Sequence, residues 1–124
     1  MNVVDSSGWL EFFGAGPNAS VFAHPIQDVP HLLVPAVTLT EVFKRILQQR
    51  DEPRALEAVG HMMQGEVVPL TSELALEAGR LGHILKIPLA DSLILATARL
   101  RGAILWTQDV DFKTIPGVRY IPKR

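Results

Sequence analysis

Four carboxylates lie far apart in the sequence but at positions where they could act together: Asp5, Glu41, Asp91 and Asp109. Two of them follow short apolar segments, and the other two lie near the predicted starts of helices. Acids that converge on one place repel one another strongly unless cations bind among them. Carboxylate oxygens suit hard cations such as Mg²⁺ or Mn²⁺, and the chain has no cysteine for a thiolate site. The residue types therefore predict a divalent-metal site.

Each acid also has an ordinary structural explanation. Thr38 and Glu41 fit a capping box, in which a Glu at the third helical position bonds back to the cap amide. Asp91 could complement the positive end of its helix, and Asp109 and Asp111 fit a polar turn after a strand. These explanations are independent of one another. Chance therefore places all of the acids at one sheet edge much more rarely than it gives any single acid a purely structural role.

The segments that must position the acids alternate between strands and helices. Short apolar runs predict strands at Asn2–Val4, Leu32–Val34, Val67–Leu70, Ala103–Trp106 and Val118–Ile121. This alternation predicts an α/β domain of three layers, α/β/α, spanning residues 1–124, with a mainly parallel sheet of four or five strands. Ligand sites in such sheets lie beyond the carboxyl ends of the strands, which is where Asp5 and Asp109 fall.

Helices are predicted where apolar residues recur every three or four positions. Three such faces are Leu39, Val42, Phe43, Ile46 and Leu47, then Leu56, Val59 and Met63, then Leu74, Ala78, Leu81 and Leu85. The segment from Asp91 to Leu100 is apolar nearly all round, which predicts burial against the sheet. Trp9, Phe12 and Phe13 belong to a first helix, and Gly14 to Asn18 form a turn into a second.

Composition limits the class of protein without choosing a function. The 124 residues, 48% of them apolar, suit one globular domain, and the net charge of −1 gives no sign of a polyanionic partner. If metal neutralised the four acids, the remaining surface would carry a net positive charge. No signal peptide is evident, and the apolar runs are shorter than the roughly 20 residues that span a bilayer. We expect a cytoplasmic protein with no membrane partner.

Four segments together resemble the PIN-domain family, especially the VapC toxins of bacterial and archaeal toxin–antitoxin pairs. They are Val3-Val4-Asp5-Ser6-Ser7, Thr40-Glu41, the run from Leu89 to Ala98, and Thr107-Gln108-Asp109-Val110-Asp111-Phe112. The resemblance implies a PIN-like fold, an endoribonuclease that uses Mg²⁺ or Mn²⁺ to hydrolyse RNA, a homodimer and an inhibitory antitoxin chain.

The resemblance also assigns residues to the site. It places Asp5, Glu41, Asp91 and Asp109 at the catalytic metal, and Thr107 as the residue that orients a carboxylate or a water. Two further roles stay open. Asp111 either joins the site or caps the following turn, and Ser6 either touches the site or only starts a helix.

Two other groups of residues have alternative roles. The aromatic residues of the first helix, with Phe43 and Leu47, either pack in the core or border a groove for a partner helix. Five cations near the acids either contact phosphates or are ordinary surface charges: Lys44, Arg45, Lys86, Arg99 and Lys113.

Other functions remain open from the sequence. A structure-specific DNA nuclease could use the same carboxylates, although such enzymes generally need large insertions to grip a duplex. A phosphoacceptor signalling domain would need an isolated Asp after the middle strand, where this chain has Thr71-Ser72. An RNA-processing nuclease without an antitoxin, or a catalytically silent binding module, would share the fold.

Overall fold

A five-stranded sheet lies at the centre of the computed structural model, which describes all 124 residues. Its strands are β1 (Asn2–Val4), β2 (Leu32–Pro35), β3 (Glu66–Val68), β4 (Ile104–Thr107) and β5 (Val118–Tyr120). They lie in the order β3-β2-β1-β4-β5, and each neighbouring pair is parallel. The predicted α/β class and the parallel five-stranded sheet are confirmed.

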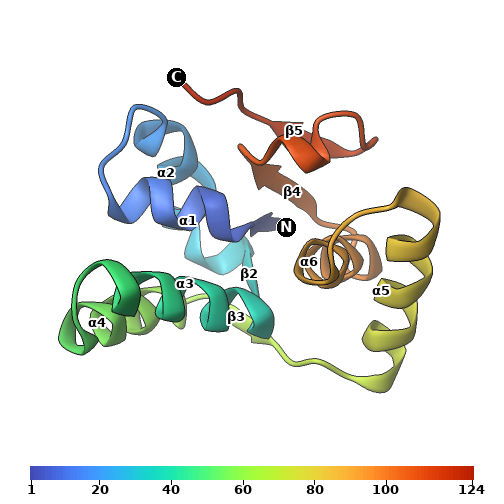
Figure 1. Ribbon diagram of the computed structural model, residues 1–124, viewed down its shortest axis with the longest axis horizontal. Coiled ribbons are helices and arrows are strands. Elements are labelled where there is room, and N and C mark those ends of the chain that lie inside the picture. Colours follow the sequence, from blue (N-terminus) through green and yellow to red (C-terminus); the bar gives the residue numbers. More distant parts are fainter.

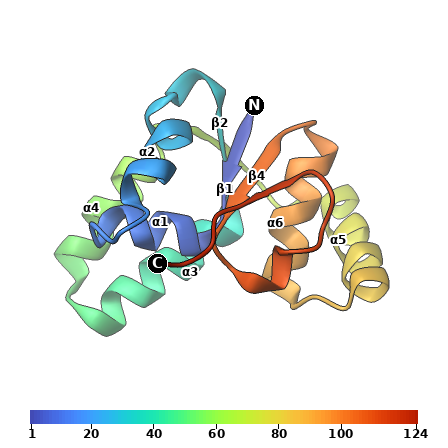
Figure 2. The same cartoon turned by 90° about the horizontal axis from the view of Figure 1, so that it is seen from above.

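Six α-helices cover the two faces of this sheet (Figures 1 and 2). On one side are α1 (Ser6–Phe13), α2 (Ala19–Gln27), α3 (Ala36–Gln49) and α4 (Glu52–Met62), and on the other are α5 (Ser72–Leu85) and α6 (Leu89–Leu100). Short 3-10 turns occupy Val29–His31 and Val110–Phe112. None of the helices is long and apolar enough to cross a membrane by itself, and α5 and α6 reach that length and composition only as a pair bent by 115°.

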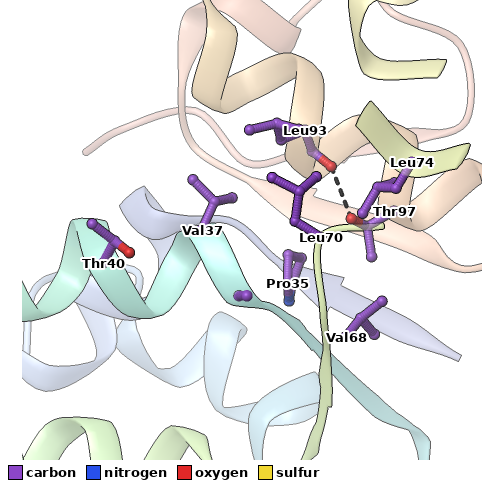
Figure 3. A pocket seen from close by; sticks show the side chains of 9 residues that line it. Pro35, Val37, Thr40, Val68, Leu70, Leu74, Leu93 and Thr97 are labelled. Atoms are coloured by element: carbon purple, nitrogen blue, oxygen red, sulfur yellow. Dashed lines mark hydrogen bonds between the residues drawn. The ribbon is translucent and has the colours of Figure 1, made fainter. Parts of the chain in front are cut away.

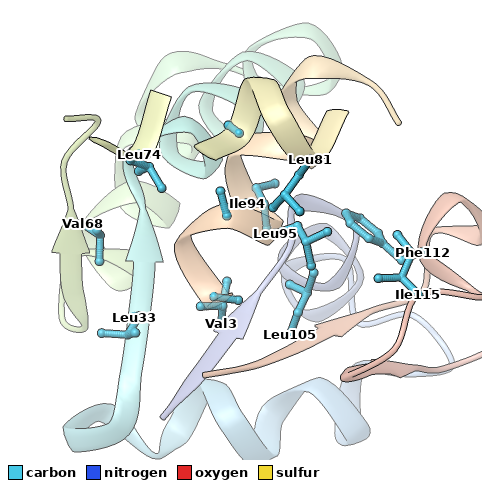
Figure 4. Close-up of a cluster of buried hydrophobic side chains, with 13 residues drawn as sticks. Val3, Leu33, Val68, Leu74, Leu81, Ile94, Leu95, Leu105, Phe112 and Ile115 are labelled. Atoms are coloured by element: carbon cyan, nitrogen blue, oxygen red, sulfur yellow. The ribbon is translucent and has the colours of Figure 1, made fainter. Parts of the chain in front are cut away.

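The alternation of side chains along each strand produces two hydrophobic cores. Val3 and Leu33 face α5 and α6, whereas Val4 and Leu32 face the other four helices. Successive strand residues point to opposite faces, so adjacent apolar residues are all buried but in different layers. Figure 4 shows the first core, in which Ile94 and Leu95 of α6 pack over Val3 and Leu105. The helix predicted from Asp91 to Leu100 is buried against the sheet as expected.

The apolar face predicted for α4 is wrong. Leu56 is 55% exposed and Met63 is 56% exposed, whereas Ala55, Ala58 and Met62 are buried. The buried face therefore lies one position earlier along the helix, about 100° around its axis. Alanine contributes little to an apolar pattern, but its small side chain allows α4 to approach α3 closely.

Candidate metal centre

The centre forms where β1 and β4 end side by side. Val4 pairs with Trp106 in the parallel register, so the next residues, Asp5 and Thr107, emerge together at the carboxyl edge of the sheet. The chain leaves β1 toward β2 on one side, while β4 lies on the other. The strand order therefore changes direction at β1, the position at which ligands bind in sheets of this type.

Asp5 is held by three hydrogen-bond donors. Its carboxylate accepts bonds from the hydroxyl of Ser7 at 2.7 Å, the amide of Gly8 at 3.0 Å and the hydroxyl of Thr107 at 2.6 Å. The bond from Gly8 makes Asp5 the N-cap of α1, which fixes where that helix begins. Burial raises the pKa of Asp5 to about 6, although the three hydrogen bonds favour its charged form and oppose that rise.

Asp91 lies in the first turn of α6, and its side-chain carboxylate accepts no hydrogen bond from the protein. Burial, and then repulsion from Asp109, Asp5, Asp111 and Glu41, raise its pKa to about 7. The other four acids therefore all lie within electrostatic range of Asp91. One carboxylate oxygen from each of Asp91, Asp109 and Asp111 lies within 4.8 Å of the others.

Glu41 reaches this cluster from α3. The hydroxyl of Ser6 donates a hydrogen bond to its carboxylate, so the first residue of α1 orients it. The capping-box explanation is wrong, because α3 begins at Ala36 with Pro35 as its N-cap, so Glu41 lies in the second turn rather than the first. Thr38 is already inside the helix, and its hydroxyl donates to the carbonyl of Pro35 instead.

The structure divides the two roles that the sequence left open for Asp111 between Asp109, which caps the turn, and Asp111, whose carboxylate lies among the acids. Asp109 caps the 3-10 turn by accepting the amide of Asp111 at 2.9 Å, and its own amide donates to the Thr107 hydroxyl at 2.9 Å. Asp111 is exposed, yet its carboxylate belongs to the same group of three. The turn therefore directs both acids toward Asp91.

The donor set suits a hard divalent cation. Every candidate ligand is a carboxylate, the oxygen donor that such cations prefer. Asp91, Asp109 and Asp111 each place one such oxygen within 4.8 Å of the other two, so these three residues are the ones that would hold the ion together. Burial and then repulsion among the acids raise the pKa of Asp91, and a bound cation would remove the second of these causes.

Ser7 belongs to the centre although sequence reasoning singled out Ser6 instead. Its hydroxyl donates to Asp5, accepts the amide of Gln108 at 3.2 Å and lies 3.4 Å from the Thr107 hydroxyl. A serine two residues after a strand-end aspartate was the available signal, because such side chains often bond to the acid that precedes them.

The aromatic residues of α1 divide between the core and a surface groove. Trp9 is fully buried, and Phe12 and Phe13 are half-buried beside it and His61. A hollow of about 550 Å³ between α1, α3 and α4, here called the α1–α4 groove, is lined by Leu10, Phe13, Ile46, Arg50, Arg54 and His61, among others. Of the five residues predicted to border a partner groove, only Phe13 lines it.

A separate cavity of about 240 Å³ lies on the other side of α3, with no carboxylate in its wall (Figure 3). Val37, Leu70, Leu74 and Leu93 surround it, and the one hydrogen bond drawn there joins Thr97 to the carbonyl of Leu93. This apolar cavity cannot coordinate a metal, so the chemistry belongs to the acidic edge of the sheet.

Comparison with solved structures finds the same fold in several toxins. A toxin–antitoxin complex from Klebsiella pneumoniae contains a chain that is 24% identical, with a TM-score of 0.75 and 95% of each chain covered. VapC20 of Mycobacterium tuberculosis, described as a toxin that cleaves the sarcin–ricin loop, is 17% identical with a TM-score of 0.79, covering 98% of this chain and 100% of its own. VapBC2 from Rickettsia felis, bound to a promoter DNA fragment, gives 15% identity and a TM-score of 0.76 over 98% and 97% of the two chains.

The sequence comparisons identify the family. No curated protein matches the chain by sequence. The model of the PIN domain matches residues 3–118. This range contains all five acids, and it contains the whole sheet except Asn2 of β1 and the last two residues of β5. The chain therefore belongs to the PIN domain family.

Proposed function

We propose that this protein is an endoribonuclease that depends on Mg²⁺ or Mn²⁺ and serves as the toxin of a toxin–antitoxin pair. One observation carries the proposal: five carboxylates from four separate segments gather around Asp91 at the carboxyl edge of a PIN-domain sheet. Burial and then repulsion from the other acids raise the pKa of Asp91 to about 7. Several of the similar solved structures are toxin–antitoxin complexes, which supports the toxin assignment.

The catalytic residues in this proposal are Asp5, Glu41, Asp91 and Asp109, which would hold the metal. A metal held there would supply an activated water and a positive charge opposite the scissile phosphate. The chain itself supplies rigid orientation. Thr107 and Ser7 fix Asp5, and Ser6 fixes Glu41. Asp111 is an additional candidate ligand because its carboxylate lies beside Asp91 and Asp109.

The experiment that tests the nuclease is a cleavage assay on RNA and DNA with rigorously purified protein. Cleavage of RNA should require Mg²⁺ or Mn²⁺, stop on chelation and disappear in Asp91→Asn. A matched control is Glu73→Gln, which removes the same charge from an exposed residue of the first turn of α5. Retained cleavage in Asp91→Asn would overturn the mechanism, and preferential cleavage of structured DNA would favour a DNA nuclease.

The α1–α4 groove offers a site for the antitoxin. Leu10, Phe13 and Ile46 are among its apolar lining residues, and its charged lining residues are Arg50, Arg54 and Glu57. A partner helix could bury its apolar face there and extend an arginine to the acids, where charge-assisted hydrogen bonds would relieve their repulsion. Co-expression with the neighbouring reading frame should yield a complex that is inactive on RNA. If the neighbour neither co-purifies nor inhibits, a nuclease of RNA processing without an antitoxin becomes the better assignment.

A homodimer is a further part of the proposal. Leu70 is 57% exposed beside the apolar cavity of Figure 3, and burial of this surface against a second copy would be favourable. Light scattering should report twice the 13.6 kDa mass of the chain. A monomer over the whole measured concentration range would remove the dimer from the proposal.

A further inference from the structure

A third hollow, here called the polar groove, adjoins the acidic centre. It has a volume of about 310 Å³ and is lined by one apolar residue, Leu10, and by Ser7, Glu11, Arg45, Gln49, Gln108 and Lys123. Ligand pockets usually span roughly 300–1,000 Å³, so the groove has room for a small unit such as one nucleotide, but not for a base-paired duplex.

The groove is continuous with the metal centre through two helices. Ser7, in its wall, donates a hydrogen bond to Asp5, and Gln108 immediately precedes Asp109. On α3, Glu41 and Arg45 are four residues apart, as are Arg45 and Gln49. This spacing places the three on one face, so α3 leads from the acids into the groove.

The charges of the groove favour an anionic ligand. Arg45 and Lys123 line it, and neither forms a salt bridge with any carboxylate of the protein. The only acid in the wall, Glu11, accepts the backbone amide of Asn18 at 2.7 Å and is therefore engaged by the chain itself. Two cations without partners thus stand beside a cluster of acids that would hold metal.

A buried asparagine fixes the shape of this wall. The side-chain amide of Asn18 donates to the side-chain oxygen of Gln108 and to the carbonyl of Pro122, both at 3.0 Å. Asn18 is fully buried, so these bonds are shielded from water. They tie the C-terminal tail to the centre and set the position of Lys123, the residue after Pro122.

We propose that the polar groove binds the backbone of single-stranded RNA next to the cleavage point, with Arg45 and Lys123 contacting a phosphate that flanks the scissile one. The inference rests on the proposed nuclease function and names how its substrate is gripped. The acids repel RNA until metal binds, whereas these cations attract it, so the groove sets where along the strand the scissile phosphate rests.

Binding of a short unstructured RNA to the Asp91→Asn protein, over a series of salt concentrations, tests the groove without cleavage. Each phosphate contact on a single strand adds about 0.7 to the slope of log affinity against log salt. Because both cations contact the same phosphate, the double variant of Arg45→Ala with Lys123→Ala should reduce the slope by about 0.7, and each single variant should weaken binding and reduce the slope by part of that amount. The matched control is Arg80→Ala, which removes an exposed cation from α5, on the opposite side of the sheet.

A second arm locates the phosphate. RNAs that carry one neutral methylphosphonate linkage, moved stepwise along the strand, should bind less tightly at one position, and Arg45→Ala with Lys123→Ala should abolish that difference. Thermal unfolding of each variant checks that the fold is kept. Salt slopes equal to that of the Arg80→Ala control, or a methylphosphonate effect that persists in the double variant, would overturn the groove.

The two proposals fail in distinguishable ways. If the native protein cleaves RNA but Arg45 and Lys123 have no effect on the salt slope, the nuclease stands and the groove falls. If RNA is not cleaved but the groove variants change its binding as described, the groove stands as part of a binding module. Loss of antitoxin binding with unchanged RNA binding would assign the two cations to the protein partner and would also overturn the inference.

Discussion

The acidic centre has two halves, Asp5 in the first and Asp91 with Asp109 and Asp111 in the second, and the protein holds the carboxylates of the two halves in different ways. Asp5 is buried and receives three hydrogen bonds from the protein. Asp91 receives none and faces four other acids. Burial is the largest cause of the raised pKa at both residues, but the next causes differ: hydrogen bonds lower the pKa of Asp5, while repulsion raises that of Asp91 further.

This difference separates anchoring from binding. Neutral donors such as Ser7, Gly8 and Thr107 fix Asp5 whether or not a cation is present. In the group of Asp91, Asp109 and Asp111, the only hydrogen bond to a carboxylate is the one that Asp109 accepts from the amide of Asp111, and a cation would stabilise the three acids together. The hydrogen bonds to Asp5 therefore offset part of the cost of burying its charge, whereas repulsion adds to the cost of burying the charge of Asp91.

The largest expected effect comes from truncating one acid in each half. Asp5→Ala should lower the free energy of unfolding by about 1–3 kcal/mol, because it removes an N-cap and leaves buried donors unsatisfied. Asp91→Ala should raise the stability of the metal-free protein above pH 7, because it removes repulsion and breaks no hydrogen bond. Both should lower RNA cleavage at least about 100-fold. Denaturant unfolding in the presence of a chelator measures the change in stability of each variant. If Asp5→Ala and Asp91→Ala changed the free energy of unfolding in the same direction, the distinction between the two halves would be wrong.

The next effect is on the pH dependence of stability. The pKa values of Asp5 and Asp91 rise in the folded state from 3.8 to about 6 and about 7. Each carboxyl therefore binds more protons when folded, so its stabilising effect is complete below pH 3.8 and is lost as the pH rises through the folded value. Without metal, the native protein should lose stability relative to Asp91→Asn between about pH 4 and pH 8.

Thermal unfolding across that pH range, in a chelator, checks the difference. Adding Mg²⁺ at pH 8 should restore the stability of the native protein, by about 2.7 kcal/mol when Mg²⁺ is at 100 times its dissociation constant, and should do far less for Asp91→Asn. A constant difference between the two proteins over the whole range would show that Asp91 carries no unusual pKa.

An intermediate effect is expected at Thr107, which links the two halves. Its hydroxyl donates to Asp5 and accepts the amide of Asp109, so Thr107→Val removes both bonds with little change in shape. Cleavage should fall about 10- to 100-fold, as for other residues that orient metal ligands. Thr107→Ser keeps the hydroxyl and should retain most of the activity. Equal losses in the two variants would point to packing rather than to orientation.

The smallest effect is expected at Asp111. Because its side chain is exposed, Asp111→Asn should change the free energy of unfolding by no more than about 0.5 kcal/mol. The affinity of the Asp111→Asn protein for Mg²⁺ should still fall, because one of the three close carboxylates is lost. Titration calorimetry measures the affinity. Unchanged affinity would exclude Asp111 as a ligand and would leave Asp91 and Asp109 as the candidate ligands of that group.

Much of the fold could be predicted because it depends on local patterns. The five apolar runs became the five strands, although β3 lies at Glu66–Val68 rather than Val67–Leu70. Helix α6 begins at Leu89, two residues before Asp91. The face of α4 was misplaced because small alanines pack closely there without adding to an apolar pattern. The capping box was wrong because Pro35 leads directly from β2 into α3.

The sequence alone determined that Asp5 and Asp109 follow strands and that Asp91 lies near the start of a helix, because the periods of strands and helices can be recognised from neighbouring residues. Only the tertiary structure decided how each acid is held. Ser7 and Thr107 meet across 100 positions, and Asn18 and Pro122 across 104. The hydroxyls that anchor Asp5, the repulsion at Asp91 and the unpaired cations of the polar groove all arise from such long-range contacts. A linear pattern carries no record of them, since they exist only once the sheet has brought distant segments to one edge.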